Sequence, residues 1–189
     1  TLLMVASTHA INPSLYKNIK FDTLKDFTSI SPIAENPFIL VIPKDLKVAS
    51  LLDLIQLARN QAGTMNYASA GIGGLPHLAG ELFKLEANIE ANHIPYKGAS
   101  PASVDLLAGH VSFMINNMQS ALPFIKDGRL RALAVTSSER ISALPNVPTF
   151  KELGYKGLEF TGWYGLLGPA GMPSATVSYT HLRAHETDS

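Results

Sequence analysis

The sequence predicts an α/β fold, because short apolar runs alternate with segments of helical periodicity along most of the chain. The chain has 189 residues, of which 46% are hydrophobic. It is therefore long enough and apolar enough for one domain or two small lobes. Phe38–Ile42 is a continuous apolar run, which is typical of a strand covered on both faces. Helical segments separate such runs, so we expect crossover connections and a largely parallel sheet.

The first elements in chain order are two strands and a capped helix. Thr1–Ala6 is mostly apolar and predicts a buried strand. After the strand at Phe38–Ile42, Ser50 and Asp53 have the spacing of a capping box, and Gly63 supplies a C-terminal stop. The apolar residues between these signals recur at helical intervals, at Leu51, Leu54, Ile55 and Ala58.

The remaining elements continue the alternation, with a glycine-rich turn expected at Ser69–Gly74. Strands are predicted at Met65–Ala68, Asn92–Pro95, Val111–Ile115, Leu130–Val135 and Phe160–Leu167. Helices are predicted at Leu75–Glu86, from Ser100-Pro101 to Gly109, at Ser120–Lys126, and after the capping box of Thr149 and Glu152 as far as Gly154.

The charge balance and the cysteine content exclude several functional classes. Fifteen basic residues balance fifteen acidic ones, so a basic face that could bind nucleic acid is not expected. No apolar run reaches the roughly eighteen residues of a membrane-spanning helix, so membrane insertion is not expected. With no cysteine, the chain has neither a disulfide nor a thiolate metal ligand.

The segment Ser69–Gly74 leads from a predicted strand into a predicted helix, where backbone N–H groups and the helix dipole attract an anion. It is therefore a candidate carboxylate or phosphate site, with the Ser69 hydroxyl as a further donor; the alternative is a tight turn that needs small residues. Three sharper motifs fail here. A dinucleotide fingerprint would need Gly where Pro76 stands, a nucleophile elbow would need Gly where Tyr67 stands, and a P-loop would need a Gly-Lys pair.

Four histidines, His9, His77, His93 and His110, lack the spacing of a metal site. No metal and no cofactor are predicted. His77 lies three residues beyond Gly74, where it could contact a ligand or brace the loop.

Polar residues follow two other predicted strands. Tyr96, Lys97 and Gly98 follow Asn92–Pro95, and α/β folds place ligands at the carboxyl ends of their strands. Lys97 suits an anion, and it is equally well explained as a solvated surface charge. Ser7 and Thr8 lie at the equivalent place after the first strand.

The chain resembles the TctC-like (Bug-type) solute-binding proteins of tripartite tricarboxylate transporters over nearly all of residues 1–176. The matching segments occur in the right order: Asp26-Phe27 with Ser31–Ala34, Tyr67–Gly74 with His77–Phe83, His93–Gly98, Asp105–Val111, Leu130–Ser137, Leu144–Thr149, and Trp163–Leu166 with Pro169–Pro173.

This resemblance implies a fragment of a two-lobed periplasmic binding protein of the type II-like architecture, with one lobe complete and the other truncated. Residues 1–37 would be the latter part of lobe one, 38–162 the complete lobe two, and 163–176 the start of the return to lobe one. The ligand contacts it implies are Ser7 and Thr8 from lobe one, and Ser69, Ala70, Gly71, Gly73, His77, Tyr96, Lys97 and Gly98 from lobe two. Asp105 fits a bracing role, because its carboxylate would repel an anionic ligand.

The resemblance further implies a monomeric, non-enzymatic carrier in the periplasm that delivers a small carboxylate to membrane permease subunits. Two alternatives stay open. One is an α/β hydrolytic enzyme that uses Ser69 with His77 or His93, and the other is a ligand-responsive partner of a sensor protein.

The last thirteen residues, Val177–Ser189, depart from the preceding pattern and resemble one reading frame of a transposase sequencing adapter. We expect this tail to be non-native. Independent resequencing of the gene should show a different continuation after about Thr176, and recovery of the same thirteen residues would contradict this expectation.

Overall fold

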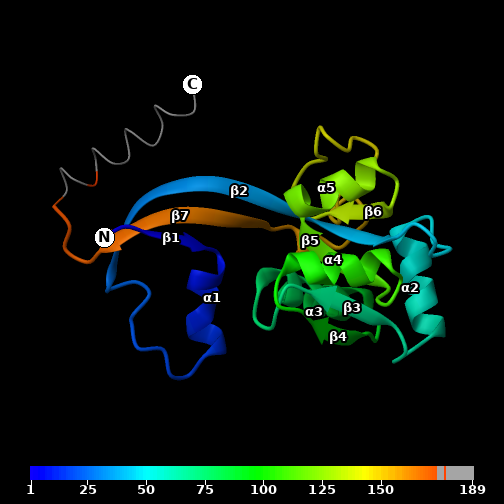
Figure 1. Ribbon diagram of the computed structural model, residues 1–189, viewed down its shortest axis with the longest axis horizontal. Coiled ribbons are helices and arrows are strands. Elements are labelled where there is room, and N and C mark those ends of the chain that lie inside the picture. The colour runs from blue at the N-terminus through cyan, green and yellow to red at the C-terminus, as the bar shows by residue number, and fades with distance from the viewer. Residues whose placement is uncertain (174–176, 178–189) are drawn as a thin grey trace. The chain divides into compact units, whose positions relative to one another are not determined.

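The computed structural model describes residues 1–173 and residue 177, so the predicted tail lies outside the described residues except for Val177. The chain divides into two compact units (Figure 1). Unit 1 comprises residues 1–36 and the chain from 162 onward, and unit 2 comprises residues 37–161. Each division falls one residue before a boundary expected between the lobes.

Unit 2 contains a mixed sheet. Its strands are β2 (Phe27–Pro43), which continues into it from unit 1, β3 (Asn66–Ser69), β4 (Asn92–Pro95), β5 (Phe113–Asn117) and β6 (Leu130–Val135). The order across the sheet is β4-β3-β5-β2-β6. Strand β3 pairs in parallel with β4 and β5, whereas β2 is antiparallel to β5 and β6. The expected parallel sheet is therefore present only at β3, β4 and β5. The prediction of a largely parallel sheet is wrong for β2, because β2 is antiparallel to both of its neighbours in this unit, β5 and β6.

Helices cover both faces of this sheet. They are α2 (Leu51–Asn60), α3 (Leu75–Ala87), α4 (Ala99–Leu107) and α5 (Met118–Lys126), followed by the 3₁₀ turn η1 (Lys156–Leu158) (Figure 1). Alternate residues of β2 point to opposite faces: Leu40 packs in one core cluster with residues of α2 and α3, and Ile39 packs in the other with residues of α4 and α5. The prediction that Phe38–Ile42 is covered on both faces is confirmed.

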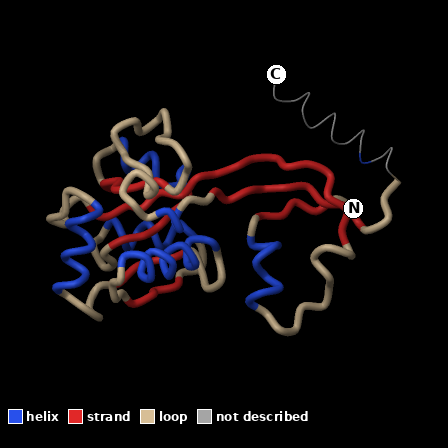
Figure 2. The backbone as a smooth tube through the Cα atoms, turned by 180° about the vertical axis from the view of Figure 1, so that it is seen from behind, coloured by secondary structure: helices blue, strands red, loops and turns tan. Residues whose placement is uncertain are grey.

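Unit 1 contains β1 (Leu3–Ala6), α1 (Thr8–Leu15) and β7 (Thr161–Pro169), which begins at the unit boundary. Strand β7 lies between β1 and β2 in the sheet order and pairs antiparallel with β1 (strands in red in Figure 2). The expectation of a buried first strand is wrong for these residues, because β1 is an edge strand here. Met4 is 67% exposed and only Val5 is buried.

One helix was not predicted, and one predicted helix needs correction. Helix α1 was not expected, because Asn12 and Pro13 interrupt its apolar pattern. The capping box of Thr149 and Glu152 forms, with both reciprocal hydrogen bonds at 2.9 and 3.0 Å. The segment that it begins is nevertheless a series of turns and not a helix, because Gly154 at φ +93° ends it within one turn. Among the described residues, no helix is long and apolar enough to cross a bilayer.

Candidate functional site

The carboxyl ends of β3, β4 and β5 meet at one edge of the unit 2 sheet. Parallel pairing sets Ser69 beside Pro95 and Ala68 beside Met114. Each of these strands therefore ends at the same edge and leads into the start of a helix, α3, α4 or α5 (Figure 1). Ligands of open α/β sheets bind at such an edge, so the candidate site is built here.

The loop between β3 and α3, Ala70–Gly74, is called the glycine loop below. Gly71 and Gly73 have φ values of +143° and +78°, which glycine adopts readily and other residues rarely adopt. Gly74 begins α3 without a side-chain cap. Within the described part of the chain, the backbone N–H groups of Ala70, Ile72 and Gly74 have no hydrogen-bond acceptor, so they are free to bind an anion at the positive end of the helix.

The segment after β4 is tied to this loop by backbone hydrogen bonds. Tyr96 N donates to Ser69 O at 3.0 Å, and Gly98 N donates to Ala70 O at 3.1 Å. Gly98, at φ +113°, is the residue that begins α4. The starts of α3 and α4 are therefore fixed to each other, and the Lys97 side chain beside them is exposed.

Two histidines lie beneath the glycine loop. Ser69 Oγ shares a hydrogen bond of 2.6 Å with His93 Nε2 and accepts one of 3.2 Å from Gly71 N. His77 Nδ1 accepts a hydrogen bond of 3.2 Å from Gly73 N. The two imidazoles stack with ring centroids 4.0 Å apart. Burial lowers the pKa of His93, and the neighbouring His77 lowers it further, so the neutral ring is favoured.

A second network holds α3 against β3. The buried Tyr67 lies with its ring stacked on that of His93 and donates a hydrogen bond of 2.6 Å from its hydroxyl to Glu81 Oε1. Lys84 Nζ contacts both carboxylate oxygens of Glu81 at 2.9 Å. Burial, followed by the hydrogen bond to Glu81, raises the pKa of Tyr67. Burial raises the pKa of Glu81, but its bonds to Tyr67 and Lys84 outweigh that effect and lower it.

Tyr96 is tied to α4 through its hydroxyl, which donates to Asp105 Oδ2 at 2.6 Å. Burial and this hydrogen bond raise the pKa of Tyr96 to about 12. The bond from Tyr96, assisted by His110, lowers the pKa of Asp105. Since a phenol has only one proton to donate, the Tyr96 hydroxyl is already committed to Asp105. In this conformation the hydroxyl is therefore used within the protein, and a contact of Tyr96 with a ligand stays a prediction.

The comparisons with known proteins decide the family. The family described as "Tripartite tricarboxylate transporter family receptor" (TctC) matches residues 1–187. The chain belongs to the TctC family. BugT of Bordetella pertussis is 39% identical over 173 residues, covering 90% of this chain and 53% of BugT. The chain spans about half the length of the curated relatives it matches.

Several solved structures share the fold of this chain. One, "R. palustris Rpa4515 with adipate", is 34% identical with a TM-score of 0.87, covering 95% of this chain and 60% of that one. Another, MatC of Rhodopseudomonas palustris with bound malate, is 27% identical with a TM-score of 0.85, covering 97% and 64%. A periplasmic transporter and the periplasmic binding protein BugD superpose equally well, so the predicted two-lobed binding-protein architecture is confirmed. This chain covers 63% and 62% of those two chains, which is consistent with one truncated lobe.

The other predicted contacts of this TctC chain, Ser7 and Thr8, belong to unit 1. They lie where β1 leads into α1, and Ser7 N donates to Trp163 O at 2.9 Å. The Ser7 side chain makes no capping hydrogen bond, so its hydroxyl is not used by the helix that it begins.

Sequence reasoning missed one part of the sheet edge, the pair Asn116-Asn117 at the end of β5. Asn117 Oδ1 caps α5 by accepting from Gln119 N at 3.1 Å. The Asn116 side chain is buried and lies between Ser103 Oγ and Asn117 N, at 3.4 and 2.8 Å. The signal was available, because Asn directly before an amphipathic segment is a strong N-cap.

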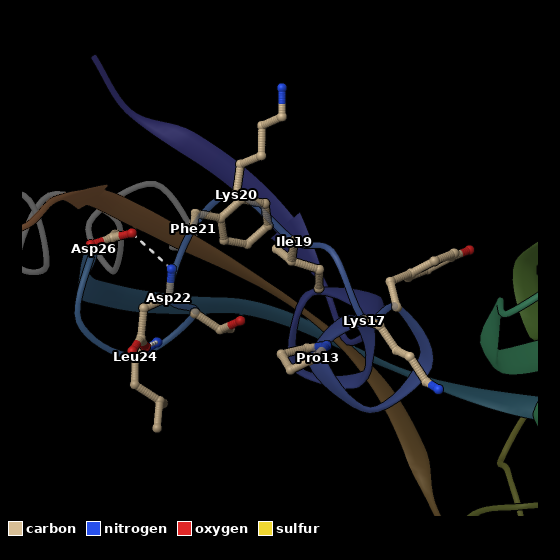
Figure 3. A pocket seen from close by; sticks show the side chains of 10 residues that line it. Pro13, Lys17, Ile19, Lys20, Phe21, Asp22, Leu24 and Asp26 are labelled. Carbon is tan, nitrogen blue, oxygen red and sulfur yellow. Dashed lines mark hydrogen bonds between the residues drawn. The ribbon is translucent and has the colours of Figure 1, made fainter.

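A hollow of about 640 Å³ lies in unit 1 of the TctC chain, between the end of α1 and the start of β2 (Figure 3). It is lined by Lys17 and Lys20 as well as Asp22 and Asp26, and Asp22 N donates to Asp26 Oδ2 at 2.7 Å. It contains no residue of the glycine loop. The candidate site is therefore the sheet edge, where N–H donors without an acceptor among the described residues converge. Among the described residues, no group of three or more His, Asp or Glu side chains is placed to hold a metal ion.

Ser69 and His93 have the separation of a nucleophile and its general base. However, Ser69 is fully buried, so no substrate carbonyl can reach its hydroxyl in this conformation. Within the described residues, no carboxylate accepts a hydrogen bond from His93, so the third member of a triad is also lacking. The geometry is that of a structural brace for the loop.

Proposed function

We propose that this protein is a periplasmic solute-binding protein that captures a small organic acid, with one carboxylate of the ligand on the glycine loop. The observation that carries the proposal is the set of N–H groups of Ala70, Ile72 and Gly74 at the start of α3, which have no acceptor among residues 1–173 and 177. Charge-assisted hydrogen bonds to such groups are about twice as strong as neutral ones. The adipate and malate named with two similar solved structures support this class of ligand.

Two parts of the site position the donors. Ser69, His77 and His93 brace the glycine loop from below, and Tyr96 with Asp105 fixes the start of α4. Lys97, exposed beside the loop, adds a positive charge that attracts a dicarboxylate to this edge. In this proposal, Ser7 and Thr8 of lobe one also contact the ligand. The protein acts as a monomer and delivers the ligand to membrane permease subunits.

Titration calorimetry on the full-length protein tests the ligand class. We expect adipate or malate to bind, and the uncharged adipamide to bind at least about tenfold more weakly, because each charge-assisted hydrogen bond is worth about 1.5–3 kcal/mol. Adipamide has nearly the shape of adipate and is therefore the matched control. Equal affinity for adipate and adipamide, or no binding of either acid, would contradict the proposal.

The hydrolytic alternative rests on the short Ser69–His93 contact and predicts turnover of an activated ester. If the protein turns over p-nitrophenyl acetate at all, we expect the Ser69→Ala variant to turn it over at the same rate. The sensor alternative predicts that deletion of the permease genes leaves the response to the acid intact, whereas a transport role predicts loss of its uptake.

A further inference from the structure

We propose that His77 is a positioning residue that holds the glycine loop in its anion-binding conformation only while its Nδ1 carries no proton, and that His93 keeps the His77 ring in place. The affinity for carboxylates would then fall at acidic pH because the protein loses the hydrogen bond that fixes the loop, and not only because the ligand itself becomes protonated. This inference rests on the proposed function of the loop and concerns the regulation of that site.

The first step is the alternation of N–H groups along the loop. The N–H groups of Gly71 and Gly73 are used inward, on Ser69 Oγ and His77 Nδ1. Those of Ala70, Ile72 and Gly74 between and beside them have no acceptor among the described residues. Because Gly73 is itself buried, its N–H would lack a partner if the histidine did not accept it, and the loop would rearrange to satisfy it.

The second step concerns the tautomer of His77. An imidazole nitrogen that accepts a hydrogen bond carries no proton, so neutral His77 has its proton on Nε2. Protonation of the ring adds a proton to Nδ1, so both ring nitrogens carry one. The new N–H on Nδ1 then faces the N–H of Gly73 across 3.2 Å. Two donors repel each other, and the hydrogen bond that fixes the loop is lost.

The third step concerns the groups around the pair. His93 lies on His77 at 4.0 Å on one side and on Tyr67 of β3 at 4.9 Å on the other. Glu81 and Lys84 of α3 are the charged groups that face the pair, and they neutralise each other at 2.9 Å. Glu81 also accepts from Tyr67, so within the described part of the chain the carboxylate that faces the pair is already paired and cannot fully stabilise two imidazolium rings in contact.

Two variants of the full-length protein separate the hydrogen bond from the ring. His77→Phe keeps an aromatic ring on His93 but removes the acceptor. His77→Asn keeps an acceptor, since an amide oxygen reaches nearly the position of Nδ1, but does not titrate. At neutral pH we expect His77→Phe to lose about five- to tenfold in affinity for adipate or malate, the value of one hydrogen bond, and His77→Asn to stay near wild type.

The pH dependence gives the second readout. As the pH is lowered from neutrality, the wild type should lose more affinity than His77→Asn, because only the wild type can place a proton on the Nδ1 that accepts from Gly73 N. Titration of the acid itself affects both proteins equally, so His77→Asn is the matched control. Wild-type affinity that rises in acid relative to His77→Asn would show that the charge of the imidazolium dominates, and would overturn the inference.

A measurement without ligand distinguishes failure of this inference from failure of the proposed function. In ¹⁵N NMR spectra of the free protein, His77 should show an unprotonated Nδ1, and the Gly73 amide signal should shift in His77→Phe and return in His77→Asn. If neither acid binds the wild type, the proposed ligand class is wrong, and these spectra still decide the role of His77. A folded His77→Phe protein with wild-type affinity and an unchanged Gly73 signal would overturn it.

Discussion

Replacement of Gly71 by Val is expected to lower carboxylate affinity by at least about tenfold in the full-length protein, and by more than Ser69→Ala does. Gly71 has a φ of +143°, which costs a β-branched residue about 1–3 kcal/mol. A Cβ at this position would lie 3.6 Å from Tyr96 O, an ordinary contact, so the effect comes from the backbone and not from crowding. Relief of the strain would turn the N–H groups of Ala70 and Ile72 away from the ligand.

Ser69→Ala is expected to have the smaller effect because the buried hydroxyl braces the loop and does not face solvent. Gly109→Val is the matched control for strain, because Gly109 has a φ of +77° and open space around it. It follows the C-terminus of α4, whereas the candidate site is at the start of that helix. Calorimetry and thermal unfolding on the same samples separate affinity from stability. If folded Gly71→Val binds like the wild type, the anion site lies instead at Tyr96–Gly98.

The strands and helices of unit 2 were largely predictable because their signals are local. The apolar run at Phe38–Ile42 and the capping box of Ser50 and Asp53 both act within a few residues, and both form as predicted. The first half of β2 was not predicted, since Phe27–Asn36 mixes exposed and buried residues without alternation. Its neighbour in the sheet, β7, lies more than a hundred residues further along the chain, and no local pattern encodes such a pairing.

The same distinction holds for the candidate site. Small residues between a strand and a helix predict the glycine loop itself. The roles of Ser69 and Tyr96 could not be predicted, because they depend on long-range register: pairing of Tyr67 with His93 brings the imidazole beneath Ser69. In the structure, several of the hydroxyl and imidazole groups predicted as ligand contacts also bond to the protein's own backbone and side chains. Their contacts with a ligand stay a prediction.

Replacement of Gly80 by Ala is expected to destabilise the protein by about 2 kcal/mol or more, although Ala is intrinsically favoured in a helix by about 1 kcal/mol. A Cβ on Gly80 would lie 2.3 Å from Tyr67 Cε2, so the ring or the helix must move. The ring cannot move easily, because it is fully buried between His93 and Phe113 and its hydroxyl is held by Glu81. We therefore expect α3 to shift, and the glycine loop at its start to shift with it.

Gly157→Ala provides the control, because its Cβ would also be too close to another atom, 2.6 Å from Glu86 Oε1. Glu86 is an exposed side chain that can swing away, so this change should alter stability by no more than about 0.5 kcal/mol. Denaturant unfolding of both variants measures the difference, and calorimetry with adipate or malate shows whether the Gly80 variant also binds more weakly. Equal stabilities for the two variants would mean that Tyr67 can give way to a methyl group. The inference that the Tyr67 ring fixes the position of α3, and with it the geometry of the proposed anion site, would then be wrong.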